Sequence, residues 1–221
     1  MISKIHSCKC LIQIIFFLFI SIYQSQQSIA QDITTEGKDF WLGFMENREE
    51  NGAIVLEIYI SASDSTGGIV SLPLANWSQE FSVNDNSTVL VTVPTNLGMA
   101  EGSGTIQNMG IHIQSNDNVS VYALNSVRVS ADATVVLPTP ALGRTYYVSS
   151  YYGGNNWSDS EFLLVAVEDN SQIEITPTTT TRDGRSAGIP YTVSLDSGQV
   201  MQVQAAGDLT GTKIKASGNC K

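Results

Sequence analysis

Histidine, the side chain that most often acts as the base in a hydrolase, is scarce in this sequence. The chain has two histidines, His6 and His112, and His112 alternates with isoleucines at positions 111 and 113. A hydrolase needs a nucleophile, a base and a group that orients the base. Ser103 stands directly between two glycines, whereas a nucleophile elbow reads Gly-x-Ser-x-Gly. The sequence therefore predicts no catalytic triad, and we expect His112 to be a solvent-facing strand residue.

Carboxylates are the abundant reactive groups. Asp and Glu together number 21, and two well-placed carboxylates suffice for glycoside hydrolysis. Nothing in the spacing of the candidates pairs them across a cleft. A non-enzymatic protein is therefore favoured, and a carbohydrate-active enzyme is kept as a remote alternative. The candidate carboxylates are Glu46, Glu49, Glu50, Asp159 and Glu161.

Oxygen ligands for a cation gather in three short segments, VNDNS, SNDN and VEDNS, which contain Asp85, Asp117 and Asp169. Calcium takes about six to eight oxygen ligands, and none of the segments matches a complete calcium-binding loop. Asn, Asp and Ser are also typical of tight turns, because their side chains bond the neighbouring backbone. Calcium is thus a weak cofactor candidate against the turn interpretation, and too few His and Cys residues are present for zinc.

One aromatic segment is the best candidate for a binding surface. TYYVSSYYGGNNWSD, residues 145–159, contains Tyr147, Tyr151, Tyr152 and Trp157 beside Gly, Asn and Ser. Tyrosine among small polar residues suits recognition, because the ring offers a large contact area and loses little rotamer entropy. We expect these four side chains to contact a glycan or glycoprotein. The alternative is that they pack in a core or a junction between units.

Apolar residues alternate with polar ones along nearly the whole chain. Residues 54–60, 89–93 and 119–123 are the clearest runs, and a period of two indicates strands with one buried face. Clusters of Asn, Asp, Ser and Gly separate the runs and predict turns. The sequence therefore predicts an all-β protein built as a sandwich or barrel. The long connection 95–109 is a candidate functional loop or crossover.

The first 30 residues have the pattern of a secretion signal. Lys4 and Lys9 precede an apolar run at 11–23, which is shorter than the ~20 residues of a membrane-spanning helix. Ser28-Ile29-Ala30 fits a cleavage site of small residues. We expect a cleaved signal peptide (1–30), a secreted or cell-surface location and no membrane insertion of the mature chain. An uncleaved anchor is the alternative.

The charge of the chain excludes some partners. The formal net charge is −10, and removal of Lys4 and Lys9 with the signal makes it −12 (−10 − 2). An acidic surface with no basic run repels phosphate backbones and anionic lipids. We therefore expect no nucleic-acid partner.

Two phrases of the sequence recur in the second half. GKDFWLGF (37–44) is echoed by GRTYYVSS (143–150), and VLEIYI (55–60) aligns with FLLVAV (162–167). We expect Phe40 and Tyr146 to lie in cores, with Trp41 and Tyr147 facing outward or toward a neighbouring unit.

This recurrence predicts a tandem architecture. Two antiparallel β-sandwich units, Ig-like or jelly-roll-like, are expected at 31–127 and 143–221, with 128–142 as a connecting segment. The segment NVSVYALNS (118–126) has no counterpart in the second half. We therefore expect the second unit to be truncated and further domains to lie beyond Lys221, where Cys220 would find a partner.

Four segments together resemble a known family. GKDFWLGFMEN, GIHIQSNDNVSVYALNS, SADATVVLPTPALGRTYYVSSY and DLTGTKIKASGN are similar to the N-terminal domain of the IgG Fc-binding protein family. The resemblance implies an extracellular, non-enzymatic, β-rich module placed ahead of other domains. It transfers no binding residues, and Fc binding does not follow from it. The expected function is a binding or adhesion module for a glycoprotein or glycan, with a structural spacer as the alternative.

Overall fold

The computed structural model describes residues 34–47, 53–128, 130–152 and 159–217. Contacts group Thr34–Lys221 as one compact unit and Met1–Ile33 as another. Within the described ranges, no helix has the length and hydropathy to cross a membrane. Several predicted features lie outside these ranges, namely the signal peptide, Glu49, Glu50, Trp157 and Cys220.

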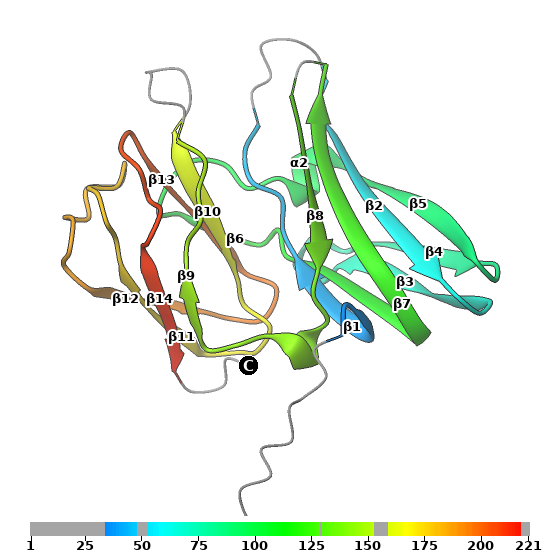
Figure 1. Cartoon of the computed structure of the whole chain (residues 1–221). Coiled ribbons are helices and arrows are strands. Elements are labelled where there is room, and N and C mark those ends of the chain that lie inside the picture. The colour runs from blue at the N-terminus through cyan, green and yellow to red at the C-terminus, as the bar shows by residue number, and fades with distance from the viewer. Residues whose placement is uncertain (1–33, 48–52, 129, 153–158, 218–221) are drawn as a thin grey trace, which may run out of the picture. The chain divides into compact units, whose positions relative to one another are not determined.

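The chain is all-β, as predicted, and its first half forms one continuous sheet. The strands follow the order β4-β3-β7-β2-β5, and β1 and β8 also pair with β7 (Figure 1). Every pairing in this sheet is antiparallel. The strands are β1 (Glu36–Leu42), β2 (Val55–Ala62), β3 (Thr66–Leu72), β4 (Trp77–Val83), β5 (Ser87–Val93), β7 (Ile111–Val127) and β8 (Ser130–Val136).

Strand β7 is the central strand of this first sheet. It runs for 17 residues; its first part pairs with β3 and its second part with β2. The register between β1 and β7 shifts where Lys38 faces the polar run 115–118. Strand β7 thus holds β3 and β2 at different parts of its length within one sheet, and the irregularity in its pairing with β1 lies between these parts.

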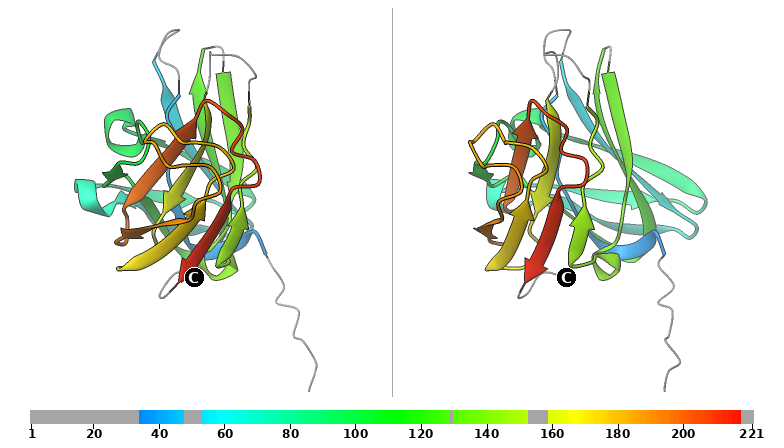
Figure 2. Two further views of the ribbon diagram at one scale, coloured as in Figure 1. Left: turned by 90° about the vertical axis from the view of Figure 1, so that its left-hand side faces the viewer. Right: turned by 60° about the vertical axis from the view of Figure 1, so that its left-hand side comes forward.

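The second half forms two smaller antiparallel sheets, β12-β11-β14-β9 and β10-β13-β6. The order β12-β11-β14-β9 repeats the order β4-β3-β7-β1 of the first half, and Figure 2 shows β14 beside β9. Its strands are β9 (Thr145–Tyr147), β10 (Ser160–Val165), β11 (Ser171–Thr176), β12 (Tyr191–Leu195), β13 (Val200–Ala205) and β14 (Lys213–Ser217).

Two segments that the sequence predicts to be connections contain secondary structure. The long connection contains α2 (Thr95–Gly98) and β6 (Ile106–Gln107). Because β6 pairs with β13, this crossover joins the first half of the chain to a sheet of the second. The segment 128–142, expected to be a simple connection, instead contains β8 and η3 (Thr139–Ala141), and β8 extends the first sheet. The remaining short element is η2 (Pro73–Ala75).

Each half has its own hydrophobic cluster. One is formed mainly by β1 to β5 and β7, and the other by β10, β11, β13 and β14. Phe40 is fully buried, as predicted, whereas the prediction for Tyr146 is wrong because 41% of this residue is exposed. Both occupy comparable positions, since Phe40 pairs with Ile113 of β7 and Tyr146 pairs with Ile214 of β14. In the first half, the chain after β8 also forms an isolated bridge with Phe40 at Pro138, and no equivalent bridge is described at Tyr146.

Candidate functional site

A buried polar contact joins the two halves of the chain. Gln202 on β13 has no solvent exposure. Its Oε1 accepts a hydrogen bond from the backbone N–H of Glu46 at 2.8 Å, and its Nε2 donates to the carbonyl oxygen of Gly102 at 3.1 Å. Both ends of the buried amide are therefore satisfied by the first half of the chain.

Two of the candidate carboxylates meet at this junction. The Nε2 of Gln204 donates to Oε2 of Glu46 at 3.2 Å and to Oε2 of Glu161 at 3.1 Å. The backbone N–H of Gly102 also bonds Oε2 of Glu46, at 2.9 Å. A glycosidase requires its substrate between the two carboxyl groups. Here an amide lies between them, so this arrangement gives the enzyme alternative no support.

Glu161 has an unusual proton affinity. The pKa of its carboxyl is raised to about 7, chiefly by burial; the hydrogen bond from Gln204 lowers it, and the charges of Glu46, Asp159 and Asp132 add to the rise. Burial raises the pKa because it removes water from the charged form. Glu161 can therefore exchange a proton near neutral pH.

Asp159, another of the candidate carboxylates, forms an ion pair instead. Arg182 donates to it through Nε and Nη2, both at 2.7 Å. This two-bond geometry is the strong form of an arginine–carboxylate contact. The Arg182 side chain is about half exposed, so the pair lies at the edge of the junction.

Sequence reasoning missed the residues that organise this junction. Gln202, Gln204 and Arg182 were not singled out, although two glutamines at alternate positions of an apolar strand were a usable signal. When β13 is considered alone, the glutamines lie on the face opposite the hydrophobic core, and polar side chains on that face are expected to be in solvent. The opposite face of β13 is covered instead by the first half of the chain.

Three of the four residues of the predicted aromatic surface lie in the part of the chain that the structure describes. Tyr147 is 65% exposed, Tyr151 80% and Tyr152 45%. Tyr147 ends β9, and the Nζ of Lys213 lies 5.9 Å from the centre of its ring. No ring stacking joins the three described tyrosines, so the structure places them on one short stretch without packing them into a core.

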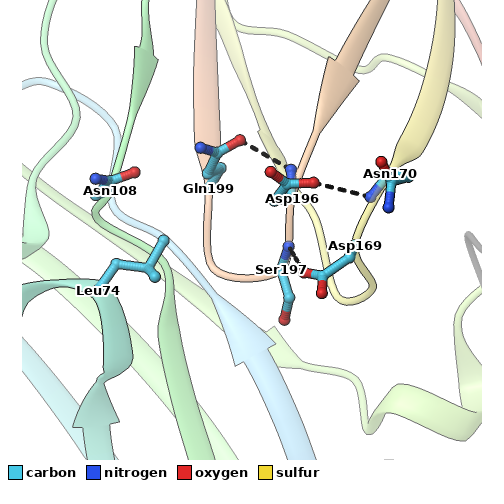
Figure 3. Close-up of a pocket in the computed structure, with 7 residues that line it drawn as sticks. All are labelled: Leu74, Asn108, Asp169, Asn170, Asp196, Ser197 and Gln199. Carbon is cyan, nitrogen blue, oxygen red and sulfur yellow. Dashed lines mark hydrogen bonds between the residues drawn. The ribbon is translucent and has the colours of Figure 1, made fainter.

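A polar hollow of about 410 Å³ lies beside the turns after β10 and β12 (Figure 3). Asp169 Oδ1 accepts the backbone N–H of Ser197 at 3.0 Å, and Asp196 Oδ1 accepts that of Asn170 at 2.9 Å. Each carboxylate thus bonds the backbone of the opposite turn, so the two turns are held together. Its lining is Leu74, Asn108, Asp169, Asn170, Asp196, Ser197 and Gln199.

The weak calcium candidates do not converge. Asp85 bonds the hydroxyl of Ser65, while Asp117 lies 3.3 Å from the ammonium group of Lys38. Asp169 lies apart from both, in the polar hollow. Among the described residues, no three His, Cys, Asp or Glu side chains are grouped to hold a metal. Asn86 and Asn170 have left-handed backbones with φ of 50° and 57°, as turn chemistry predicts, and calcium stays an untested prediction.

The prediction of a solvent-facing His112 is wrong. Its side chain is 16% exposed, and Nε2 lies 2.8 Å from Oδ2 of Asp39. The ring of Trp41 stacks on it with centroids 4.1 Å apart. Thr139 donates to the other oxygen of Asp39 at 2.6 Å. The hydroxyl bonds the carboxylate and not the imidazole, so the cluster ties β1, β7 and η3 together and is not a catalytic triad.

The structure thus defines an all-β protein with two hydrophobic clusters, an exposed tyrosine segment and a polar hollow. The predicted family resemblance is confirmed: residues 132–220 match the family described as IgGFc binding protein. The human IgGFc-binding protein is 29% identical over 198 residues, which is 86% of this chain and 4% of that protein. The chain therefore spans a small fraction of this relative. No solved structure matches the chain.

Proposed function

We propose that this chain is a secreted or cell-surface binding module that recognises an extracellular glycoprotein or glycan without catalysing a reaction. The observation that carries the proposal is the exposure of Tyr147, Tyr151 and Tyr152 on one six-residue stretch (147–152) of a strongly acidic protein. Large rings held in solvent lose apolar hydration when a partner covers them. The similarity to a protein named for IgG Fc binding supports a protein partner.

The test is a binding screen with the full chain against glycan and glycoprotein arrays that include human IgG Fc. A partner found in the screen is then titrated against Tyr147→Ala, Tyr151→Ala and Tyr152→Ala. Each substitution should weaken binding at least fivefold, since aromatic anchors dominate recognition energies. Ile189→Ala is the matched control, because Ile189 is 62% exposed and far from these tyrosines in sequence. Equal binding by all four variants contradicts the proposal.

A structural spacer is the second candidate, and the junction favours it. The buried amide of Gln202 and the β6–β13 pairing hold the two halves of Thr34–Lys221 together. A spacer needs such stiffness and no ligand. The spacer is supported if the screen finds no partner and substitution of the tyrosines leaves the function of the whole protein unchanged.

A further inference from the structure

Strand β10 has a second edge that no described strand occupies. It pairs with β13 along Ser160–Val165, and β13 also pairs with β6. Strand β2 of the first half lies between β5 on one side and β7 on the other. The two strands have comparable positions, because Ile58 lies opposite Val91 of β5 and Leu164 lies opposite Met201 of β13. The free edge of β10 therefore corresponds to the edge of β2 that β7 covers.

The backbone at this edge is available at two positions. Ser150 Oγ accepts the N–H of Glu161 at 2.9 Å and donates to its carbonyl oxygen at 2.8 Å. Alternate residues of a strand present their backbone groups to the same edge, so Leu163 and Val165 also face away from β13. No described strand pairs with them there. A row of such groups is a template for a further strand.

The residue of the second half that corresponds to Phe40 is more exposed than Phe40 itself. Phe40 has no exposure, whereas Tyr146 is 41% exposed although the two pair with equivalent isoleucines of β7 and β14. In the first half, β7 leads into β8, and the chain that follows pairs with Phe40 through an isolated bridge at Pro138. No described segment of the second half does the same, so Tyr146 stays partly in solvent.

We propose that the free edge of β10 is an interaction surface that accepts an extended strand of a partner protein, paired antiparallel to β10. Backbone hydrogen bonds to Leu163 and Val165 hold the incoming strand, as in other cases of strand addition. Its side chains toward the core are small and aliphatic, because Val121 and Ala123 occupy the corresponding positions opposite β2.

The charge around this edge further defines the partner strand. The carboxylates of Glu46 and Asp132 act electrostatically on Glu161 at one end of β10, whereas the nearby Asp159 is already paired with Arg182. A basic residue at that end of the incoming strand is favoured, since unlike charges attract most strongly where water is partly excluded. In the free protein, the Ser150 hydroxyl is hydrogen-bonded to the N–H and the carbonyl oxygen of Glu161. An incoming strand needs these two groups, so it displaces Ser150 when it binds.

The test uses the peptide NVSVYALNS, which is the segment 118–126 that includes the part of β7 beside β2. The labelled peptide is titrated into the full chain by fluorescence anisotropy, and amide hydrogen exchange is measured with and without it. Saturable binding is expected, with exchange at Leu163 and Val165 slowed at least tenfold. A peptide N-methylated on the edge that faces β10 should bind at least tenfold more weakly, while one N-methylated on the opposite edge should bind normally.

Ser150→Ala provides a protein variant with a distinctive effect. Removing the hydroxyl frees the backbone of Glu161, so the peptide should bind severalfold more tightly. Ser149→Ala is the matched control, because Ser149 is exposed and should leave the affinity unchanged.

Three outcomes overturn the proposal. The first is that a scrambled peptide binds as well as the native sequence. The second is that the peptide protects amides at another edge, such as that of β8. The third is that the exchange protection of Leu163 and Val165 rises with protein concentration in the absence of peptide, which would assign the edge to a second copy of the chain.

Discussion

The side-chain oxygen of Gln202 accepts the backbone N–H of Glu46 at 2.8 Å, across 156 positions of the sequence. The same amide donates to the carbonyl oxygen of Gly102, and Gln202 has no solvent exposure. A buried polar group costs little free energy while its partners are present and much more when one is removed. This amide therefore makes the association of the two halves specific.

Replacing Gln202 by Leu should lower the free energy of unfolding by about 2–4 kcal/mol, because the N–H of Glu46 and the carbonyl of Gly102 lose their partner. Urea denaturation at pH 7 measures the effect. Gln79→Leu is the control, since Gln79 is an exposed residue of β4 and its replacement should change stability by less than about 0.5 kcal/mol. Equal effects of the two substitutions would show that the junction contributes nothing.

Glu161 makes stability depend on pH. Its folded-state pKa of about 7 lies above the ordinary value of 4.5, so its contribution is fully present below pH 4.5 and is lost as the pH rises through 7. Glu161→Gln stays neutral. We expect the variant to match the native chain near pH 4.5 and to exceed its stability at pH 8 by up to about 3 kcal/mol.

Urea denaturation at pH 4.5, 6 and 8 tests this dependence on Glu161. Glu80→Gln is the control, because Glu80 is exposed on β4 and its substitution should leave the pH profile unchanged. A stability gain for Glu161→Gln that is constant from pH 4.5 to 8 would refute the assignment of the titrating group.

Gly110 allows the crossover strand to approach the second half. Its N–H donates to the carbonyl oxygen of Gly198 at 2.9 Å, and an added Cβ would lie 2.6 Å from that oxygen. Gly110→Ala should therefore destabilise the chain by about 2 kcal/mol or more, through a backbone clash that a side-chain rotation cannot relieve.

The N–H of Gly104, in the crossover 95–109, donates to the carbonyl oxygen of Gln202. Hydrogen exchange of this amide therefore reports whether the crossover stays in place, and the amide should become less protected in Gly110→Ala. Gly143→Ala is the matched control, since the nearest atom to its added Cβ is 3.9 Å away. Native protection of Gly104 in the Gly110 variant would count against this account of the junction.

The Asp39 cluster should be sensitive to the loss of one hydroxyl. Thr139→Val removes the 2.6 Å hydrogen bond to Asp39 and should cost about 1.5–3 kcal/mol, the range for a bond to a charged group. Thr134→Val on the exposed face of β8 is the control. Thermal unfolding measures both, with Trp41 fluorescence as a probe because its ring stacks on His112. An unchanged melting temperature for Thr139→Val would exclude a stabilising role for the cluster.

The alignment of the two halves shows where sequence patterns fail. Matching VLEIYI with FLLVAV places Leu163 at the position of Leu56. The strand pairing places Phe162 there, since Leu56 lies opposite Val93 and Phe162 opposite Val203 in equivalent ladders. A slip of one residue exchanges the two faces of a strand. The slip arose because both faces of β10 carry apolar residues, and Leu163 and Val165 lie near Gly43 of the first half.

The sequence by itself determined the alternating runs at 54–60, 89–93 and 119–123, the turns between them and the buried position of Phe40, because alternation and turn chemistry are local properties of the chain. Tertiary structure alone decided that Gln202 is buried, that Glu46 and Glu161 share one amide, and that Tyr146 stays exposed. Each of these depends on which distant segment covers a given face. Burial by another part of the chain sets the desolvation and partners of a polar group, and no spacing along a single strand encodes it.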